Sequence, residues 1–203
     1  MSMTMAGSRR IAAQPVCAEG ATGMAKPKIS TDWLAGCAGC EMSLLDIDER
    51  IVQVAELADI RSTPITDLKV PDESGVDVGI LTGAVNNSYN QEVAERMRNR
   101  AKCLVALGDC AVFGGVVAMR NFFKLEDSLK RAYIETESTD SAGMIPTDPE
   151  LAVPMEVKAV GEVVKVDLSV PGCPPEADVI FYVLAELAQG RIPEIKGDKL
   201  HWH

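Results

Sequence analysis

Histidine is scarce in this sequence. Among the 203 residues only His201 and His203 are histidines, and both stand at the very end of the chain. A Ser–His–Asp arrangement needs a histidine beside its nucleophile, so this form of catalysis is not indicated, and we do not expect the terminal pair to bind a metal. A P-loop is also missing, because the glycine-rich residues 108–115 contain no Gly-Lys-Ser or Gly-Lys-Thr. The sequence therefore offers no convincing catalytic acid, base or nucleophile.

Long apolar runs and an excess of positive charge are missing too. No stretch approaches the roughly 18 apolar residues of a membrane-spanning helix, and Arg9-Arg10 is not followed by the apolar region of an export signal. The chain has 20 basic and 30 acidic residues and a formal net charge of −10. This balance argues against binding to nucleic acid or to an anionic membrane. We therefore expect a cytoplasmic protein that acts on neither.

Strand and helix patterns alternate from residue 28 onward. The sequence predicts strands at residues 28–34, 59–62, 76–81, 102–107 and 163–170, of which 76–81 is expected to be buried and 102–107 is a further apolar run. Helical periodicity predicts helices at residues 41–57, 88–100, 121–134 and 176–189. Residues 135–156, rich in acids and proline, are interpreted as a long surface loop. The alternation predicts an α/β fold with an open, doubly wound, mostly parallel sheet, and the specific expectation is a flavodoxin-like strand order.

The pattern indicates a single domain with a tail. Residues 1–27 are rich in Met, Ala, Gly and Ser and lack periodicity, so we expect a flexible N-terminal tail. Residues 28–203 are expected to form the one domain, since 47% of the chain is apolar and can supply a core. In open parallel sheets, ligands bind outside the carboxyl ends of the strands.

Six cysteines carry the chemistry that the rest of the sequence lacks. In the cytoplasm they are more often ligands or buried thiols than a disulfide framework. Cys17 in the tail and Cys103 inside an apolar strand are expected to be bystanders. The other four follow predicted strands, next to Gly or Pro: Cys37, Cys40, Cys110 and Cys173. Because parallel strands end at one edge, these four are expected to converge, and four thiolates are what a [4Fe–4S] cluster requires.

Two other interpretations of these cysteines stay open. The pair Cys37-x-x-Cys40 is also compatible with a thioredoxin-type redox pair. Four thiolates can also hold a structural zinc ion, although zinc ribbons usually supply two Cys-x-x-Cys knuckles and here Cys110 and Cys173 stand far apart. The scattered pattern favours a cluster over a zinc-stabilised or redox-inert binding module. Metal analysis separates these cases.

Three segments resemble the small subunits of [NiFe] hydrogenases. Residues 33–46, WLAGCAGCEMSLLD, are similar to that family's N-terminal cluster loop. Residues 108–112, GDCAV, and 171–175, PGCPP, resemble its later ligand segments. Together with Met119-Arg120-Asn121, the resemblance is closest to the small subunit of soluble, bidirectional, NAD-reducing hydrogenases, and it covers about residues 28–191.

The resemblance implies a role in electron transfer. Its implied ligands for one proximal [4Fe–4S] cluster are Cys37, Cys40, Cys110 and Cys173. Electrons would pass between the Ni–Fe centre of a separate [NiFe] hydrogenase large subunit and a diaphorase module, whose subunits carry flavin and further iron–sulfur clusters and bind NAD. The chain would then be an oxidoreductase subunit that is not catalytic alone. Since no cysteine follows Cys173, one cluster is expected.

Glu41 and Thr82 occupy two further positions that bear on the family resemblance. Glu41 matches a polar position near the large-subunit interface, and the preferred interpretation is an acidic residue placed favourably at a helix N-terminus. Thr82 stands where many members of the family carry Glu, which puts a role for that Glu in doubt here. The alternative is the cluster-bearing subunit of a complex I-like quinone oxidoreductase, a family that typically has adjacent cysteines where this chain has Cys37-x-x-Cys40.

Overall fold

The computed structural model describes residues 26–140 and 143–199. Cys17 and the two histidines lie outside these ranges, and so does the expected N-terminal tail, apart from residues 26 and 27. Among the described residues, no helix is both long and apolar enough to cross a membrane.

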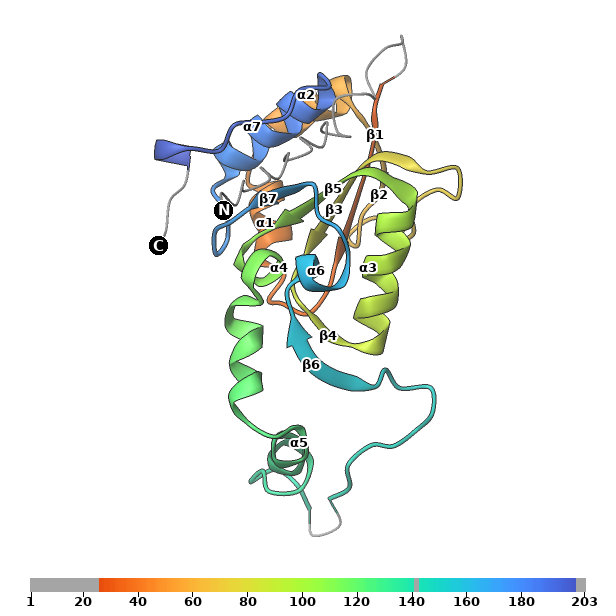
Figure 1. Cartoon of the computed structure of the whole chain (residues 1–203), viewed down its shortest axis with the longest axis vertical. Coiled ribbons are helices and arrows are strands. Elements are labelled where there is room, and N and C mark those ends of the chain that lie inside the picture. Colours follow the sequence, from red (N-terminus) through yellow and green to blue (C-terminus); the bar gives the residue numbers. More distant parts are fainter. Residues whose placement is uncertain (1–25, 141–142, 200–203) are drawn as a thin grey trace, which may run out of the picture.

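Five strands form one sheet in the order β2-β1-β3-β5-β7 (Figure 1). Their bounds are β1 Lys28–Trp33, β2 Asp59–Ser62, β3 Val76–Thr82, β5 Ala101–Leu107 and β7 Leu168–Val170. All four pairings are parallel. Numbered along the chain, these strands lie in the order 2-1-3-4-5, which confirms the expected flavodoxin-like sheet.

Helices cover both faces of this sheet. One face packs against α1 Gly39–Leu45, α2 Arg50–Leu57 and α7 Ala177–Ala188, and α2 and α7 lie side by side (Figure 1). The other face packs against α3 Ser88–Arg100, α4 Asp109–Phe113 and α6 Val160–Val163. Strand β5, which lies between β3 and β7, contributes to both layers, since Val105 belongs to the first core and Leu104 to the second. A strand that is buried on both faces is mostly apolar, which is why the apolar run at residues 102–107 predicted a strand.

The single helix expected at residues 41–57 is wrong. The chain forms α1 and α2 instead, and the break falls at Asp48, which has a positive φ of 54°. Asp is a weak helix former that tolerates the left-handed conformation. The turn keeps Ile47 in the core, whereas Ile51, which one continuous helix would place on the same face, is exposed.

The region before Cys173 also differs from expectation. The predicted strand at residues 163–170 is reduced to β7, because Val163 already ends the short helix α6. The loop expected at 135–156 contains the start of a strand, β6 Pro154–Lys158, which pairs antiparallel with β4 Val85–Asn87. This small second sheet was not visible as alternation because β6 buries only Val157.

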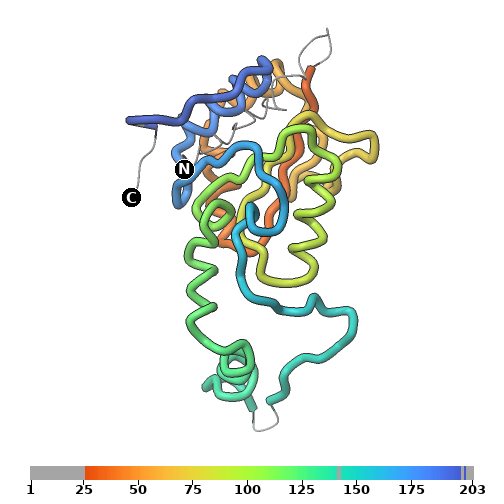
Figure 2. The backbone as a smooth tube through the Cα atoms, viewed as in Figure 1, coloured from red at the N-terminus to blue at the C-terminus, as the bar shows by residue number. Residues whose placement is uncertain are grey.

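An arm projects from the sheet domain between α4 and β6. It begins with the 3₁₀ helix η2 Gly115–Phe122 and continues into α5 Leu125–Tyr133, where a single helix was expected at 121–134. Figure 2 shows this green segment reaching away from the rest of the backbone. None of the side chains of η2 or α5 is buried.

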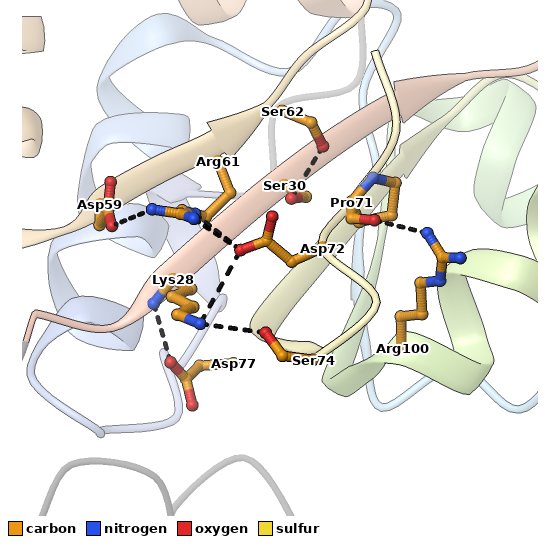
Figure 3. A network of polar contacts seen from close by, with 10 residues as sticks. All are labelled: Lys28, Ser30, Asp59, Arg61, Ser62, Pro71, Asp72, Ser74, Asp77 and Arg100. Carbon is orange, nitrogen blue, oxygen red and sulfur yellow. Dashed lines mark hydrogen bonds and ion pairs between the residues drawn. The ribbon is translucent and has the colours of Figure 1, made fainter. Parts of the chain in front are cut away.

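The amino edge of the sheet is closed by a polar network (Figure 3). Asp72 pairs with Arg61 of β2 at 2.7 Å and with Lys28 of β1 at 3.8 Å, which ties the connection between β2 and β3 to β2 and β1. The backbone amide of Lys28 donates to Asp77 at 2.8 Å. These contacts fix the edge opposite to the cysteines.

Candidate functional site

Four cysteines line one cavity at the carboxyl edge of the sheet. The cavity has a volume of about 310 Å³, and its walls include Cys37, Cys40, Cys110 and Cys173. The structure thus brings together the four residues that the sequence pattern placed at strand ends. Cys103 lies away from them within β5, 1% exposed in the core.

The first two cysteines stand on the loop that follows β1. Backbone bonds continue the strand past its end, since Ala35 and Ala84 exchange N–H···O bonds of 2.9 and 2.7 Å. The chain then turns through Ala38, whose φ is 63°, and enters α1 at Gly39. The Gly39 amide donates to the Sγ of Cys37 at 3.4 Å. Cys37 is exposed and Cys40 is half-buried.

Cys110 lies on α4, the one-turn helix directly after β5. Gly108, which precedes this helix, has a φ of +89°, and a Cβ there would overlap the Sγ of Cys40. Glycine is therefore required both by the backbone conformation and by the approach of a sulfur. Burial raises the pKa of Cys110, while hydrogen bonds from the backbone of Val117 and Val116 act in the opposite direction. Amide donors of this kind stabilise a thiolate or a cluster sulfur.

The turn that carries Cys173 is bonded to the other two segments. The amide of Gly108 donates to the carbonyl of Val170 at 2.7 Å, which continues the pairing of β5 with β7. Asp109 and Gly172 are joined twice, by an Asp109 amide bond of 2.8 Å and by a carboxylate that accepts from the Gly172 amide at 2.7 Å. The Ser43 hydroxyl of α1 donates to the carbonyl of Pro175 at 2.5 Å. All three cysteine-bearing segments are therefore tied together.

The ionisation of Cys40 is opposed by its burial and by the thiols around it. Burial, followed by the charges of Cys110, Cys37 and Cys173 and of Glu41, raises the pKa of Cys40 to about 12. Four thiolates at one place are electrostatically unfavourable unless a positively charged group joins them, and metal coordination removes thiol protons outright. The site therefore favours a cationic centre.

Glu41 stands in the first turn of α1, at the helix N-terminus as expected, and it is buried beside this cavity. It is 1% exposed, and its two carboxylate oxygens face the hydroxyls of Thr31 and Thr82, each at 3.4 Å. Burial raises the pKa of Glu41, and the two hydroxyl contacts oppose the shift. Thr82 thus contacts a carboxylate supplied by α1. No signal in the sequence distinguishes this buried position from an exposed first-turn Glu.

The dimensions of the site do not suit a single ion. Four thiolates on zinc lie about 2.3 Å from the metal. Within residues 26–140 and 143–199, no three His, Cys, Asp or Glu side chains come close enough to share one ion. The four sulfurs instead surround a cavity with room for a larger body.

An open parallel sheet with four cysteines gathered at its carboxyl edge defines a class of α/β protein suited to hold a thiolate-ligated group. The family described as NADH ubiquinone oxidoreductase, 20 Kd subunit, matches residues 37–187, and the chain belongs to this family. Membership implies that it binds an iron–sulfur cluster.

Two proteins similar to this chain are hydrogenase subunits. The chain is 38% identical over 170 residues to the NAD-reducing hydrogenase HoxS subunit delta of Cupriavidus necator, covering 82% of this chain and 80% of that protein. It is 37% identical over 177 residues to a subunit of the F420-non-reducing hydrogenase of Methanothermobacter marburgensis, covering 86% of this chain but only 58% of that protein. The chain thus spans little more than half of some of the relatives it matches.

A solved structure agrees with these relatives. A chain of the crystal structure of NAD⁺-reducing [NiFe]-hydrogenase in the H₂-reduced state superposes with a TM-score of 0.84 at 38% identity. The match covers 88% of this chain and 100% of that chain. The recognition of a hydrogenase small-subunit relative from its cysteine segments is confirmed.

Proposed function

We propose that this chain is the electron-transferring small subunit of a cytoplasmic [NiFe] hydrogenase and holds one proximal [4Fe–4S] cluster. The single observation that carries the proposal is the convergence of four cysteines on one cavity of about 310 Å³. Similarity to the NAD-reducing hydrogenase subunit supplies the reaction. We propose that the part of the chain from residue 28 onward forms a single domain.

The ligands of the cluster are proposed to be Cys37, Cys40, Cys110 and Cys173. Thiolate is the usual ligand of iron–sulfur clusters, and four of them complete a [4Fe–4S] cluster. When bound, such a cluster accepts and donates one electron at a time. Among the described side chains, no three His, Cys, Asp or Glu residues lie close enough to bind one ion, and this weighs against a structural zinc site.

The chain's own residues perform three tasks around the cluster. The bonds between Asp109 and Gly172 hold two ligand segments at a fixed separation. The amides near Val116 donate toward the Cys110 sulfur and lower the cost of its negative charge. Gly108 keeps the space beside Cys40 open. A site held in place in this way changes its geometry little when an electron arrives.

Two kinds of partner are proposed, a large subunit with the Ni–Fe centre and diaphorase subunits with flavin and further clusters. Apolar side chains at the edge of the cavity support a covering partner, since Trp33 lines the cavity and is exposed, and Met42 on α1 is exposed as well. Obligate interfaces are more apolar than ordinary surface. A complex I-like quinone oxidoreductase remains the second candidate, because the matching family carries that name.

The proposal is tested by purifying the chain without oxygen, alone and with its large subunit. We expect a brown protein with iron and acid-labile sulfide and an iron–sulfur EPR signal on reduction. Alone it should show no H₂-dependent dye reduction, and co-expression with the large subunit should restore that activity. Colourless protein with stoichiometric zinc, or H₂ oxidation by the isolated chain, would contradict the proposal. A quinone-dependent activity with no response to H₂ would favour the second candidate.

A further inference from the structure

The 3₁₀ helix η2 presents one exposed apolar face. Side chains three residues apart eclipse each other in a 3₁₀ helix. Val116, Met119 and Phe122 therefore lie in one row, here called the ridge, and they are 61%, 59% and 84% exposed. At about 2.0 Å per residue, the ridge is about 12 Å long.

The other two faces of η2 are attached to the domain. The Arg120 guanidinium donates to the carbonyl of Met155. The Asn121 side chain bonds the backbone of Val157 twice, donating to its carbonyl at 2.8 Å and accepting from its amide at 2.9 Å. An amide that pairs with a strand backbone in this way fixes the rotation of the helix. The direction of the ridge is therefore set by the fold.

The ridge starts at the cluster site. Backbone hydrogen bonding links Val116 to Cys110, a proposed ligand. Chain continuity is also direct, because η2 follows α4 immediately after Gly114. A protein that covers the cavity closely enough to exchange electrons must therefore meet the first residues of the ridge.

We propose that the ridge inserts into an apolar groove of the large subunit that carries the Ni–Fe centre. This rests on the proposed function and names the contact that would join the two subunits. Phe supplies a large apolar surface, and the flexible Met side chain adapts to an irregular groove. No charged side chain lies on the ridge, so insertion buries no unpaired charge.

The experiment compares two triple variants of the full chain, each co-expressed with the large subunit. The ridge variant carries Val116→Ser, Met119→Ser and Phe122→Ser. The control variant carries Ile65→Ser, Leu68→Ser and Val70→Ser, which are also exposed but lie between β2 and β3. Iron content and the EPR signal are measured on each chain alone, and its affinity for the large subunit is measured by titration.

We expect both variants to keep their iron and EPR signal, and the ridge variant alone to bind the large subunit at least about tenfold more weakly, as expected when a central apolar contact is lost. Equal affinity of ridge and control variants would overturn the inference. So would a wild-type chain that forms dimers which the ridge variant lacks. If the triple ridge variant loses iron, the single variant Phe122→Ser is tested instead, and its affinity for the large subunit is compared with that of the control variant. The proposed function would instead be refuted by a wild-type chain that binds zinc, or by one that does not co-purify with the co-expressed large subunit.

Discussion

The carboxylate of Asp109 accepts a hydrogen bond from the backbone amide of Gly172 at 2.7 Å, across 63 residues of sequence. The return bond, from the Asp109 amide to the Gly172 carbonyl, is 2.8 Å long. Together they set the separation of Cys110 and Cys173, each of which directly follows one of the bonded residues.

Replacement of Asp109 by Ala should weaken cluster retention. The Gly172 amide loses its acceptor, and the loss of such a bond to a charged group costs about 1.5–3 kcal/mol. We expect less iron per chain and a lower melting temperature of the iron-loaded protein. Asp109→Asn keeps an acceptor oxygen, so its iron content and melting temperature should lie between those of the wild type and of Asp109→Ala. Equal iron retention by all three proteins would show that the backbone bond alone fixes the segments.

Each of the four cavity cysteines should be needed for full iron content. Serine is a poor ligand for iron in a cluster site, so Cys37→Ser, Cys40→Ser, Cys110→Ser and Cys173→Ser should each lose iron and visible absorbance. Cys103→Ala is the matched control, since Cys103 lies in the core near the opposite end of β5. Iron and sulfide are quantified per chain. A loss in the Cys103 variant as large as in the Cys110 variant would contradict the ligand assignment.

Gly108→Ala should close the site. The added methyl would overlap the Cys40 sulfur, and the residue would be held at a φ of +89° that non-glycine residues rarely adopt. We expect almost complete loss of the cluster. Gly161→Ala is the control because its Cβ would meet nothing within 4 Å. It should retain iron and gain up to about 1 kcal/mol of helix stability. Cluster binding by the Gly108 variant at the wild-type level would refute this account of the cavity.

A part-buried ion pair should make stability depend on pH. Burial of Asp167 opposes its ionisation, but the Leu104 amide and the Arg98 guanidinium outweigh this and hold the pKa of Asp167 below its usual range. The side chain is 8% exposed, and it meets Arg98 at 2.5 Å. A depressed carboxyl pKa stabilises the fold at pH values above the unfolded pKa, and that contribution disappears as the pH falls through the folded pKa.

Asp167→Asn tests this pair. At pH 7 the variant should unfold with a free energy about 1–3 kcal/mol lower than the wild type. The difference should shrink as the pH falls below about 4, the usual pKa of an unfolded Asp. The difference in unfolding free energy is measured by urea unfolding of both proteins without their cluster. The loss of acid-labile sulfide at low pH then does not affect the comparison. A difference that does not change with pH would indicate that the charge contributes nothing.

Removal of the cluster should loosen three segments selectively. If the cluster joins the three strand ends, its binding free energy is part of the folding free energy. Hydrogen exchange should accelerate at residues 35–41, 108–115 and 171–175, while the amides of β3 and β5 stay protected. Equal protection of those loops with and without cluster would count against this expectation.

The inner part of the sheet was predictable because β3 and β5 are buried on both faces. Runs such as Val76–Thr82 remain apolar almost without interruption, and glycine follows directly. The break at Asp48 was not predictable, because a positive φ at one residue leaves the apolar spacing of α1 and α2 almost intact. The pairing of β4 with β6 was also hidden, since it depends on partners far apart in sequence.

The convergence of the cysteines was equally predictable, because topology brings all parallel strand ends to one edge. The buried environment of Glu41 could not be predicted from the sequence. Its burial depends on Thr31 and Thr82, which meet it only after β1 and β3 have paired. Local sequence specifies which residues reach the site, whereas tertiary packing specifies how polar its surroundings are.

The late position of Cys173 has a consequence for biosynthesis. Cys37, Cys40 and Cys110 leave the ribosome first, and Cys173 follows 63 residues after Cys110. At synthesis rates of about 5–20 residues per second, the nascent chain exposes three thiols for roughly 3–13 seconds before the fourth exists. The turn that carries Cys173 can be placed only when β7 joins β5. On the proposed ligand assignment, a complete cluster site exists only after translation has passed β7, and metal captured earlier would meet three cysteines instead of four.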